Sequence, residues 1–194
     1  MIKPSNYETT TAERIGEQPQ LPPGAYTCVI KNAIDTKTKA GDSKLELWLD
    51  IADGEYKDFI EKQYNFANER FGNAYWRGTY NQLTSGKSLR FFKGLIEDIE
   101  ASNPGYTFNF DEKTLVGKKI GGVFRREEYE NKNGENKFST KCYYCVKTTD
   151  VKNFKAPEDK LLDKTKVNNN SGVSYVSDSG LPMEEIGDDD SVPF

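Results

Sequence analysis

The sequence predicts a mainly β domain of five strands, with one helix between the third and fourth strands and a disordered C-terminal tail. Three observations support this prediction. Apolar and polar residues alternate, as in half-buried strands, in several segments between residues 24 and 151. A helical period replaces the alternation at residues 85–102, and no period continues beyond residue 154. We therefore expect a flexible N-terminal arm (residues 1–23), a folded domain (24–155), a disordered linker (156–187) and an acidic tail (188–194).

The first three strands are expected before residue 66. Residues 24–37 follow a polar, proline-containing arm, and in them Tyr26, Cys28 and Ile30 alternate with other residues. Residues 44–53 alternate most clearly, and one face of this strand consists of Leu45, Leu47, Leu49 and Ile51. Asp53-Gly54 favours a two-residue hairpin turn, so the third strand is expected at about residues 56–66, next to the second.

The helix is expected after an aromatic-rich segment. Residues 65–84 have no clear period, and we interpret them as a loop with at most a short helix. The single apolar face of residues 85–102 is formed by Leu89, Phe92, Leu95, Ile96 and Ile99. Ser85 or Ser88 can cap the start of this helix, and Asn103-Pro104-Gly105 ends it.

Two longer strands complete the domain, at residues 118–130 and 137–151, joined by the polar loop 131–135. The order of three strands, one helix and two strands is similar to that of the oligonucleotide/oligosaccharide-binding barrel, or OB-fold. In that fold the helix would close one end of the barrel, which explains a single apolar face. The alternative is another small α+β sheet fold with the same order of elements.

Charge is divided unevenly along the chain. All 27 Lys and Arg residues precede residue 167, whereas six of the 31 Asp and Glu residues follow it. A slightly basic body with an acidic end is expected of a nucleic-acid-binding protein with a regulatory tail. Hydrophobic residues make up 35% of the chain and the mean hydropathy is −0.80, which indicates that part of the chain lies outside a core.

Catalysis is not expected from this sequence. It contains no histidine, the most common general base and metal ligand. Ser85-Gly86-Lys87-Ser88 is not a phosphate-binding loop, because Asn81 stands where that motif requires glycine. Cys142 and Cys145 have the spacing of half a zinc site, but residues three apart on a strand are expected to point to opposite faces. Together with Cys28 they are interpreted as packing cysteines, and we predict no catalytic residue, metal or cofactor.

A surface of rings and cations is the remaining feature that suggests a function. Binding of single-stranded nucleic acid without sequence preference requires rings that stack on bases and cations along the phosphates. Trp48 is the main ring candidate, because it lies on the polar face of the second strand; the alternative is that the N-terminal arm covers it. Further candidates near the aromatic segment are Tyr64, Phe66, Tyr75, Trp76 and Arg77, most of which we expect to be buried. Candidate phosphate contacts, with one more ring, are Lys37, Lys39, Lys44, Lys118, Lys119, Arg125, Arg126, Lys141, Tyr143 and Lys147.

The last residues of the sequence form a pattern of their own. Asp188, Asp189 and Asp190 are followed by Ser191 and then by Val192, Pro193 and Phe194. The three acids resist burial, the proline stiffens the chain, and the phenylalanine places its ring next to the terminal carboxylate. Such a peptide is suited to an apolar pocket with basic residues around its rim. This pattern resembles the acidic, Pro-Phe-ended tail of single-stranded DNA-binding proteins, with Val192 where that family usually has Ile. The alternative is an ordinary acidic terminus.

The resemblance is specific at residues 188–194, whereas over residues 24–154 it is one of element order and residue type. It implies a phage-encoded protein that binds and protects single-stranded DNA, without sequence preference, in replication, recombination and repair. It also implies that Asp188, Asp189, Asp190, Val192, Pro193 and Phe194 recruit partner proteins and can compete with DNA for the basic face. A homo-oligomer is compatible with this prediction.

The alternative function is that of a protein-interaction OB module in a phage replication or recombination complex, with little DNA binding of its own. No window of the sequence approaches the ~18 apolar residues of a membrane span, and no secretory signal pattern opens it. Three cysteines, an odd number, fit reduced thiols. We therefore expect a cytoplasmic protein, in the host cell if it is phage-encoded.

Overall fold

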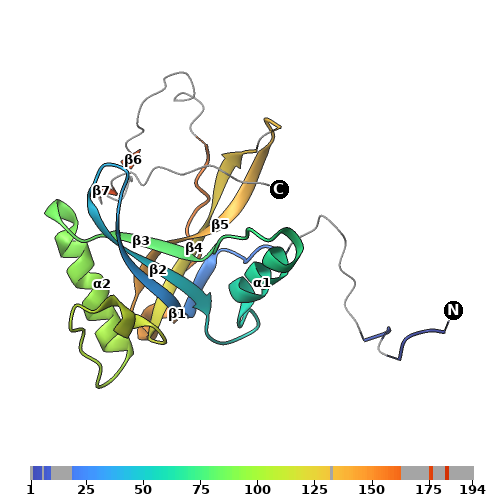
Figure 1. Cartoon of the computed structure of the whole chain (residues 1–194), viewed down its shortest axis with the longest axis horizontal. Coiled ribbons are helices and arrows are strands. Elements are labelled where there is room, and N and C mark those ends of the chain that lie inside the picture. Colours follow the sequence, from blue (N-terminus) through green and yellow to red (C-terminus); the bar gives the residue numbers. More distant parts are fainter. Residues whose placement is uncertain are drawn as a thin grey trace.

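A five-stranded antiparallel sheet of order β3-β2-β1-β4-β5 organises the structure (Figure 1). This computed structural model describes residues 2–5, 7–9, 19–131 and 133–162, and the backbone of residues 175–176 and 182–183. The five strands of the sheet are β1 (Gly24–Lys37), β2 (Ser43–Ile51), β3 (Thr79–Leu83), β4 (Lys119–Glu130) and β5 (Asn136–Val146). The helices are α1 (Phe59–Phe71) and α2 (Leu89–Ser102), with short 3-10 turns at Gly86–Ser88, Glu112–Leu115 and Thr148–Asn153. Two further short strands, β6 (Tyr175–Val176) and β7 (Pro182–Met183), pair with each other.

The central strand β1 is long enough to pair with two partners along its length. Its residues 28–37 pair with β2, and residues 24–29 pair with residues 119–124 of β4. In Figure 1 the β1–β2 hairpin rises to the upper left and the β4–β5 hairpin to the upper right. The edge strands β3 and β5 contact each other, but no backbone ladder joins them among the described residues. The predicted mainly β architecture is confirmed, whereas the sheet is not a closed barrel.

The core lies on the inner face of this sheet. The predicted alternation of the second strand is confirmed, because Leu45, Leu47, Leu49 and Ile51 are all buried. They pack with Cys28 and Ile30 of β1, Ile120 and Phe124 of β4, and Leu95 and Ile99 of α2. Burial of such side chains is the main stabilising contribution to a fold of this kind.

The prediction of a third strand at residues 56–66 is wrong. Residues 59–71 form the helix α1, and the third strand is instead residues 79–83, within the segment expected to be a loop. Ile60 and Tyr64, four residues apart, lie on the helix face that packs against the sheet. Asp50 of β2 accepts hydrogen bonds from the first N–H groups of the helix, and Gly72 ends it in a left-handed conformation. The predicted Asp53-Gly54 hairpin is therefore also wrong, since this turn leads into α1.

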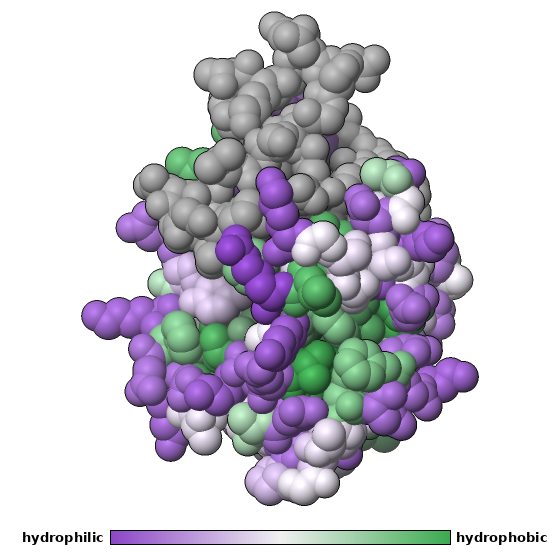
Figure 2. All heavy atoms as spheres, turned by 90° about the vertical axis from the view of Figure 1, so that its left-hand side faces the viewer, coloured by the Kyte–Doolittle hydropathy of each residue, from purple (hydrophilic) through white to green (hydrophobic). Residues whose placement is uncertain are grey.

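The helix predicted at residues 85–102 is confirmed as a short 3-10 turn followed by α2. Leu95 and Ile99 of α2 are buried, while Leu89 at its start is exposed. Figure 2, which faces the α2 side of the molecule, shows green apolar groups interrupted by purple hydrophilic ones. The last predicted strand is too long, because β5 ends at Val146 and a 3-10 turn follows at Thr148–Asn153.

Two β-bulges change the direction of side chains. In the pairing of β1 with β2 the register skips Lys31, and in the pairing of β4 with β5 it skips Tyr143. A bulge places an extra residue on one strand and shifts the alternation of side chains beyond it. For this reason Cys142 and Cys145 both pack against the core, so the expectation that they point to opposite faces is wrong.

Candidate nucleic-acid interface

The exposed cations of the β1–β2 hairpin lie at its turn. Thr38 and Asp42 close this turn by a backbone hydrogen bond of 2.8 Å, with Gly41 at a φ of 93°. Lys37 and Lys39 flank Thr38 and are exposed. Lys44, the third candidate of this hairpin, is mostly buried, and its Nζ lies 3.4 Å from Glu46 Oε2. Of these three candidates, the two turn lysines therefore present the accessible ammonium groups.

The β4–β5 hairpin brings together several predicted residues on its outer face. Arg125 lies opposite Lys141, and its guanidinium is 3.6 Å from the centroid of the Tyr143 ring. Tyr143 is the bulge residue of β5, and cation–π contact at this distance is attractive. Glu127 partly neutralises the cluster, with oxygens 2.8 Å from Arg125 and 3.8 Å from Lys141. The result is a ring held beside two cations and one acid.

Arg126 lies on the other face of the same hairpin. Its guanidinium is 5.1 Å from the Phe138 ring and donates two hydrogen bonds to the carboxylate of Asp159, one of them 2.9 Å long. This hydrogen bonding lowers the pKa of Asp159 and raises that of Arg126. An aromatic ring and a cation are thus adjacent here too, but the cation already has an anionic partner.

Trp48 and Trp76 form a stack with each other. Their rings are nearly parallel, at 11° and 5.7 Å between centroids, and Tyr64 lies 5.4 Å from Trp76. Trp76 is only 8% exposed, and its Nε1 donates to the carbonyl of Leu49. Trp76 is therefore a core residue, contrary to its prediction as a base-stacking ring. Trp48 is half-buried with Trp76 over one ring face, and its Nε1 donates to Glu46.

The exposed rings of this region lie in the second half of α1 and just after it. Phe66 is 48% and Tyr75 is 53% exposed, and the Arg77 guanidinium is 6.0 Å from the Tyr75 ring. Sequence reasoning missed a similar pair, Arg70 and Phe71, in which the guanidinium is 5.6 Å from a ring that is 53% exposed. The signal for it was an arginine next to an aromatic residue before Gly72, where a helix can end.

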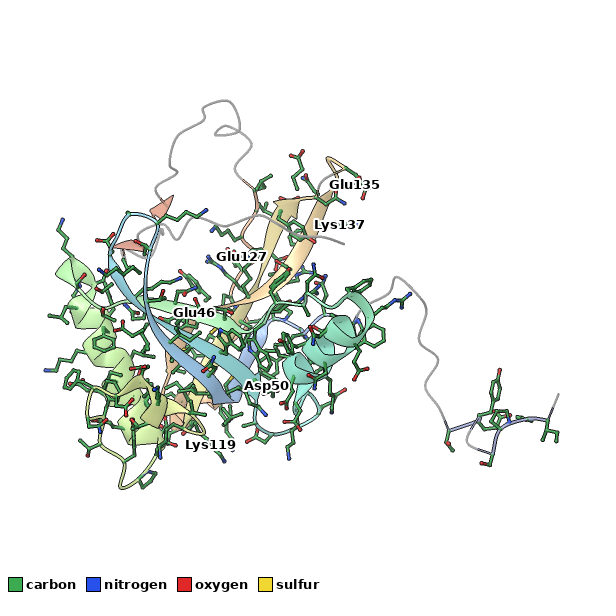
Figure 3. All side chains as sticks on the ribbon, viewed as in Figure 1. Glu46, Asp50, Lys119, Glu127, Glu135 and Lys137 are labelled. Atoms are coloured by element: carbon green, nitrogen blue, oxygen red, sulfur yellow. The ribbon has the colours of Figure 1, made fainter. Side chains whose placement is uncertain are left out.

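The remaining candidates lie elsewhere. Lys119 is at the start of β4, at the lower end of the sheet in Figure 3, whereas Glu127 lies in its upper half. Lys118 Nζ is 4.4 Å from the Tyr106 ring, and Lys147 Nζ is 3.8 Å from Asp150. Lys118 and Lys119 therefore lie at the start of β4, away from the turns of the two hairpins.

A cluster of three acids lies where β2 meets the start of α1. Among the described residues, Asp50, Asp58 and Glu61 place carboxylate oxygens within 4.8 Å of one another. The ammonium group of Lys31 lies beside these acids, with Nζ 2.9 Å from a carboxylate oxygen of Glu61 and 4.0 Å from one of Asp58. The buried Asp50 accepts hydrogen bonds from three backbone N–H groups, although burial raises its pKa. The Lys31 ammonium balances part of the charge of these acids and forms ion pairs with Asp58 and Glu61.

The cysteines pack together on the inner face of the sheet. Burial raises the pKa of Cys28, and a hydrogen bond with Cys145, together with burial, raises that of Cys142. Cys28 is fully buried, and Cys142 and Cys145 pack against the same core, so all three occupy packing positions.

Segments assigned to the arm and the linker contact the β4–β5 hairpin. Gln20 donates to the Phe138 carbonyl, Thr140 donates to the Leu21 carbonyl, and Lys160 pairs with β4. The predicted tail residues Asp188, Asp189, Asp190, Val192, Pro193 and Phe194 lie outside the described residues. Within the described part of the chain, no helix has the length and apolar character needed to cross a membrane.

Comparison with known protein families gives no family that matches this chain, and a search of curated proteins gives no match either.

Proposed function

We propose that this protein binds single-stranded DNA without sequence preference, through a surface that includes the β1–β2 and β4–β5 hairpins. The observation that carries the proposal is that both hairpins present exposed cations, and that both extend towards the top of Figure 1, one on the left and one on the right. Oligonucleotide-binding barrels use the loops in these two positions, together with the face of their second and third strands. Binding of this kind would protect single strands during replication, recombination and repair.

The fold supports this proposal through its strand order. The five antiparallel strands have the order β3-β2-β1-β4-β5, and the edge strands β3 and β5 contact each other. In the sequence, α2 lies between β3 and β4. This arrangement is expected of a partly open OB-fold barrel. α1 is an addition between β2 and β3. We therefore propose an OB-fold that carries an extra helix on its outer face.

The side chains support it through pairs of rings and cations. Arg125 with Tyr143, and Arg77 with Tyr75, each join a flat ring to a guanidinium group. Base stacking on a ring contributes about 1–3 kcal/mol for each base and tolerates any sequence. Arginine beside a ring can contact a phosphate or stack on a base itself.

One observation favours the second candidate, an interaction module for proteins. Several of the cations have acidic neighbours, as in Arg125–Glu127 and Arg126–Asp159. Such a mixed surface suits a charged protein partner as well as phosphates. Under this alternative, the acidic tail and the domain would both bind proteins of a replication or recombination complex.

The test is the affinity for fluorescein-labelled oligo(dT), measured by anisotropy. We expect tight binding that weakens as the salt concentration rises. The double substitution Lys37→Ala/Lys39→Ala should weaken binding at least about tenfold. It should also make the plot of log affinity against log salt concentration less steep, by about 0.7 for each phosphate that is no longer bound. The control is Lys93→Ala, which removes an exposed lysine from α2 and leaves binding unchanged. Absence of binding by the unaltered protein would favour the interaction module. Tryptophan fluorescence is a poor probe, because Trp76 is buried against Trp48.

A further inference from the structure

A short segment after β5 lies along the outer edge of β4. β1 pairs with β4 only as far as Phe124, so the following residues of β4 extend beyond it. Lys160 pairs with this edge in parallel orientation. Its N–H donates to the Arg126 carbonyl at 2.9 Å, and its carbonyl accepts from the Glu128 N–H at 2.8 Å. The edge is therefore covered by the chain itself, which is one way to protect an unpaired strand.

Side chains hold the same segment to the hairpin. Asp159 pairs with Arg126 through both carboxylate oxygens, and the Leu162 N–H donates to Glu128 Oε2 at 3.0 Å. Lys160 Nζ lies 4.0 Å from Glu127. We call residues 159–162 the latch.

Asp159 offers Arg126 the type of partner that a nucleic acid would offer. A carboxylate and a phosphate both present two oxygens to the guanidinium fork, so only one of them can take this geometry at a time. Phe138, whose ring is 5.1 Å from the guanidinium, lies beside the same group. A base next to the bound phosphate would therefore find a ring within reach.

We propose that single-stranded nucleic acid displaces Asp159 from Arg126, so that the latch leaves the β4 edge when the ligand binds. This inference rests on the proposed function and adds a regulatory contact to it. The latch acts as an intramolecular competitor, and it lies in the segment that leads from the sheet towards the acidic residues at the end of the sequence.

The latch is held weakly enough to be displaced. Its ion pair is accessible, with side chains that are 45% exposed for Arg126 and 27% for Asp159. Exposed pairs contribute little to stability. The backbone of the latch is joined to β4 by two hydrogen bonds, both made by Lys160. Hydrogen bonds at the edge of a sheet open more easily than those of a central strand.

The test compares two substitutions that each remove one negative charge. Asp159→Asn removes the partner of Arg126, whereas Glu158→Gln changes the exposed neighbouring acid. We expect Asp159→Asn to bind labelled oligo(dT) about two- to fivefold more tightly than Glu158→Gln, the range of one exposed ion pair. In an Arg126→Ala background the two substitutions should have equal effects, because the competition then has no target.

Hydrogen exchange of the full-length protein gives a second readout. Addition of oligo(dT) should accelerate exchange of the Lys160 and Glu128 amides, which form the ladder contact of the latch. Equal affinities of the two variants, or slower exchange of these amides with ligand, would overturn the latch while leaving the proposed function in place. If the unaltered protein does not bind oligo(dT) at all, the proposed function fails first and the latch with it.

Discussion

At the scale of single residues, Asp50 connects the sheet to α1. Its side chain is fully buried, and Oδ1 accepts from Ile51 at 2.8 Å and from Ile60 at 2.9 Å. The contact with Ile60 satisfies an N–H group at the helix start, where no intrahelical acceptor exists. Asp58, the residue before the helix, has a φ of 57° and makes no side-chain cap. An acid from another element thus takes the place of a local cap.

We expect Asp50→Ala to lower the free energy of unfolding by about 2–4 kcal/mol, because it leaves buried N–H groups without an acceptor. Urea denaturation followed by circular dichroism measures this loss. Asp53→Ala, which removes an exposed acid a few residues later, should change stability by no more than about 0.5 kcal/mol. Similar losses for the two variants would contradict the role assigned to Asp50.

At the scale of elements, local patterns identified some segments and failed for others. The alternation of Leu45 to Ile51 and the helical face of residues 85–102 predicted β2 and α2 correctly, because each element buries one face. α1 was missed, because the acceptor at its start lies on β2, ten residues away from Ile60. The bulge at Tyr143 was missed too, since a bulge depends on the pairing of two strands and leaves no period in either one.

The close packing of α1 and β3 on β2 depends on Gly78. A Cβ at this position would lie 2.2 Å from the Leu49 carbonyl oxygen and 2.6 Å from Ile60 Cδ1. We expect Gly78→Ala to destabilise the protein by about 3 kcal/mol, as severe overpacking does. Gly94→Ala in α2 is the matched control: nothing lies within 4 Å of its Cβ position, so the helix should gain up to about 1 kcal/mol. The unfolding temperatures of both variants measure these effects. An unchanged unfolding temperature for Gly78→Ala would refute the role assigned to Gly78.

At the scale of the whole molecule, composition identified the candidate cations but not their partners. Arg126 and Asp159 are 33 residues apart in the sequence, and no local pattern indicates that they pair. The same holds for the stack of Trp48 on Trp76, which turned an expected binding ring into a core residue. What a charged or aromatic residue does depends on which elements the fold brings beside it.

The salt dependence of binding belongs to this scale, because it counts phosphate contacts over the entire surface. With about three to five contacts, affinity for oligo(dT) should fall about 20- to 130-fold between about 50 and 200 mM salt. Titrations at four salt concentrations give the slope. A slope near zero would mean that the cations do not contact phosphates.

The distal β4–β5 hairpin is bounded on both sides by segments that are distant in sequence. Residues 20–21 hold β5 through Phe138 and Thr140, and residue 160 holds β4. An isolated two-stranded ribbon is at best marginally stable in water. The hairpin should therefore melt locally before the rest of the sheet once both neighbours are removed, as a small cooperative unit of its own. Its rigidity depends on the two stretches of chain that border it, so heat or proteolysis would be expected to act there first.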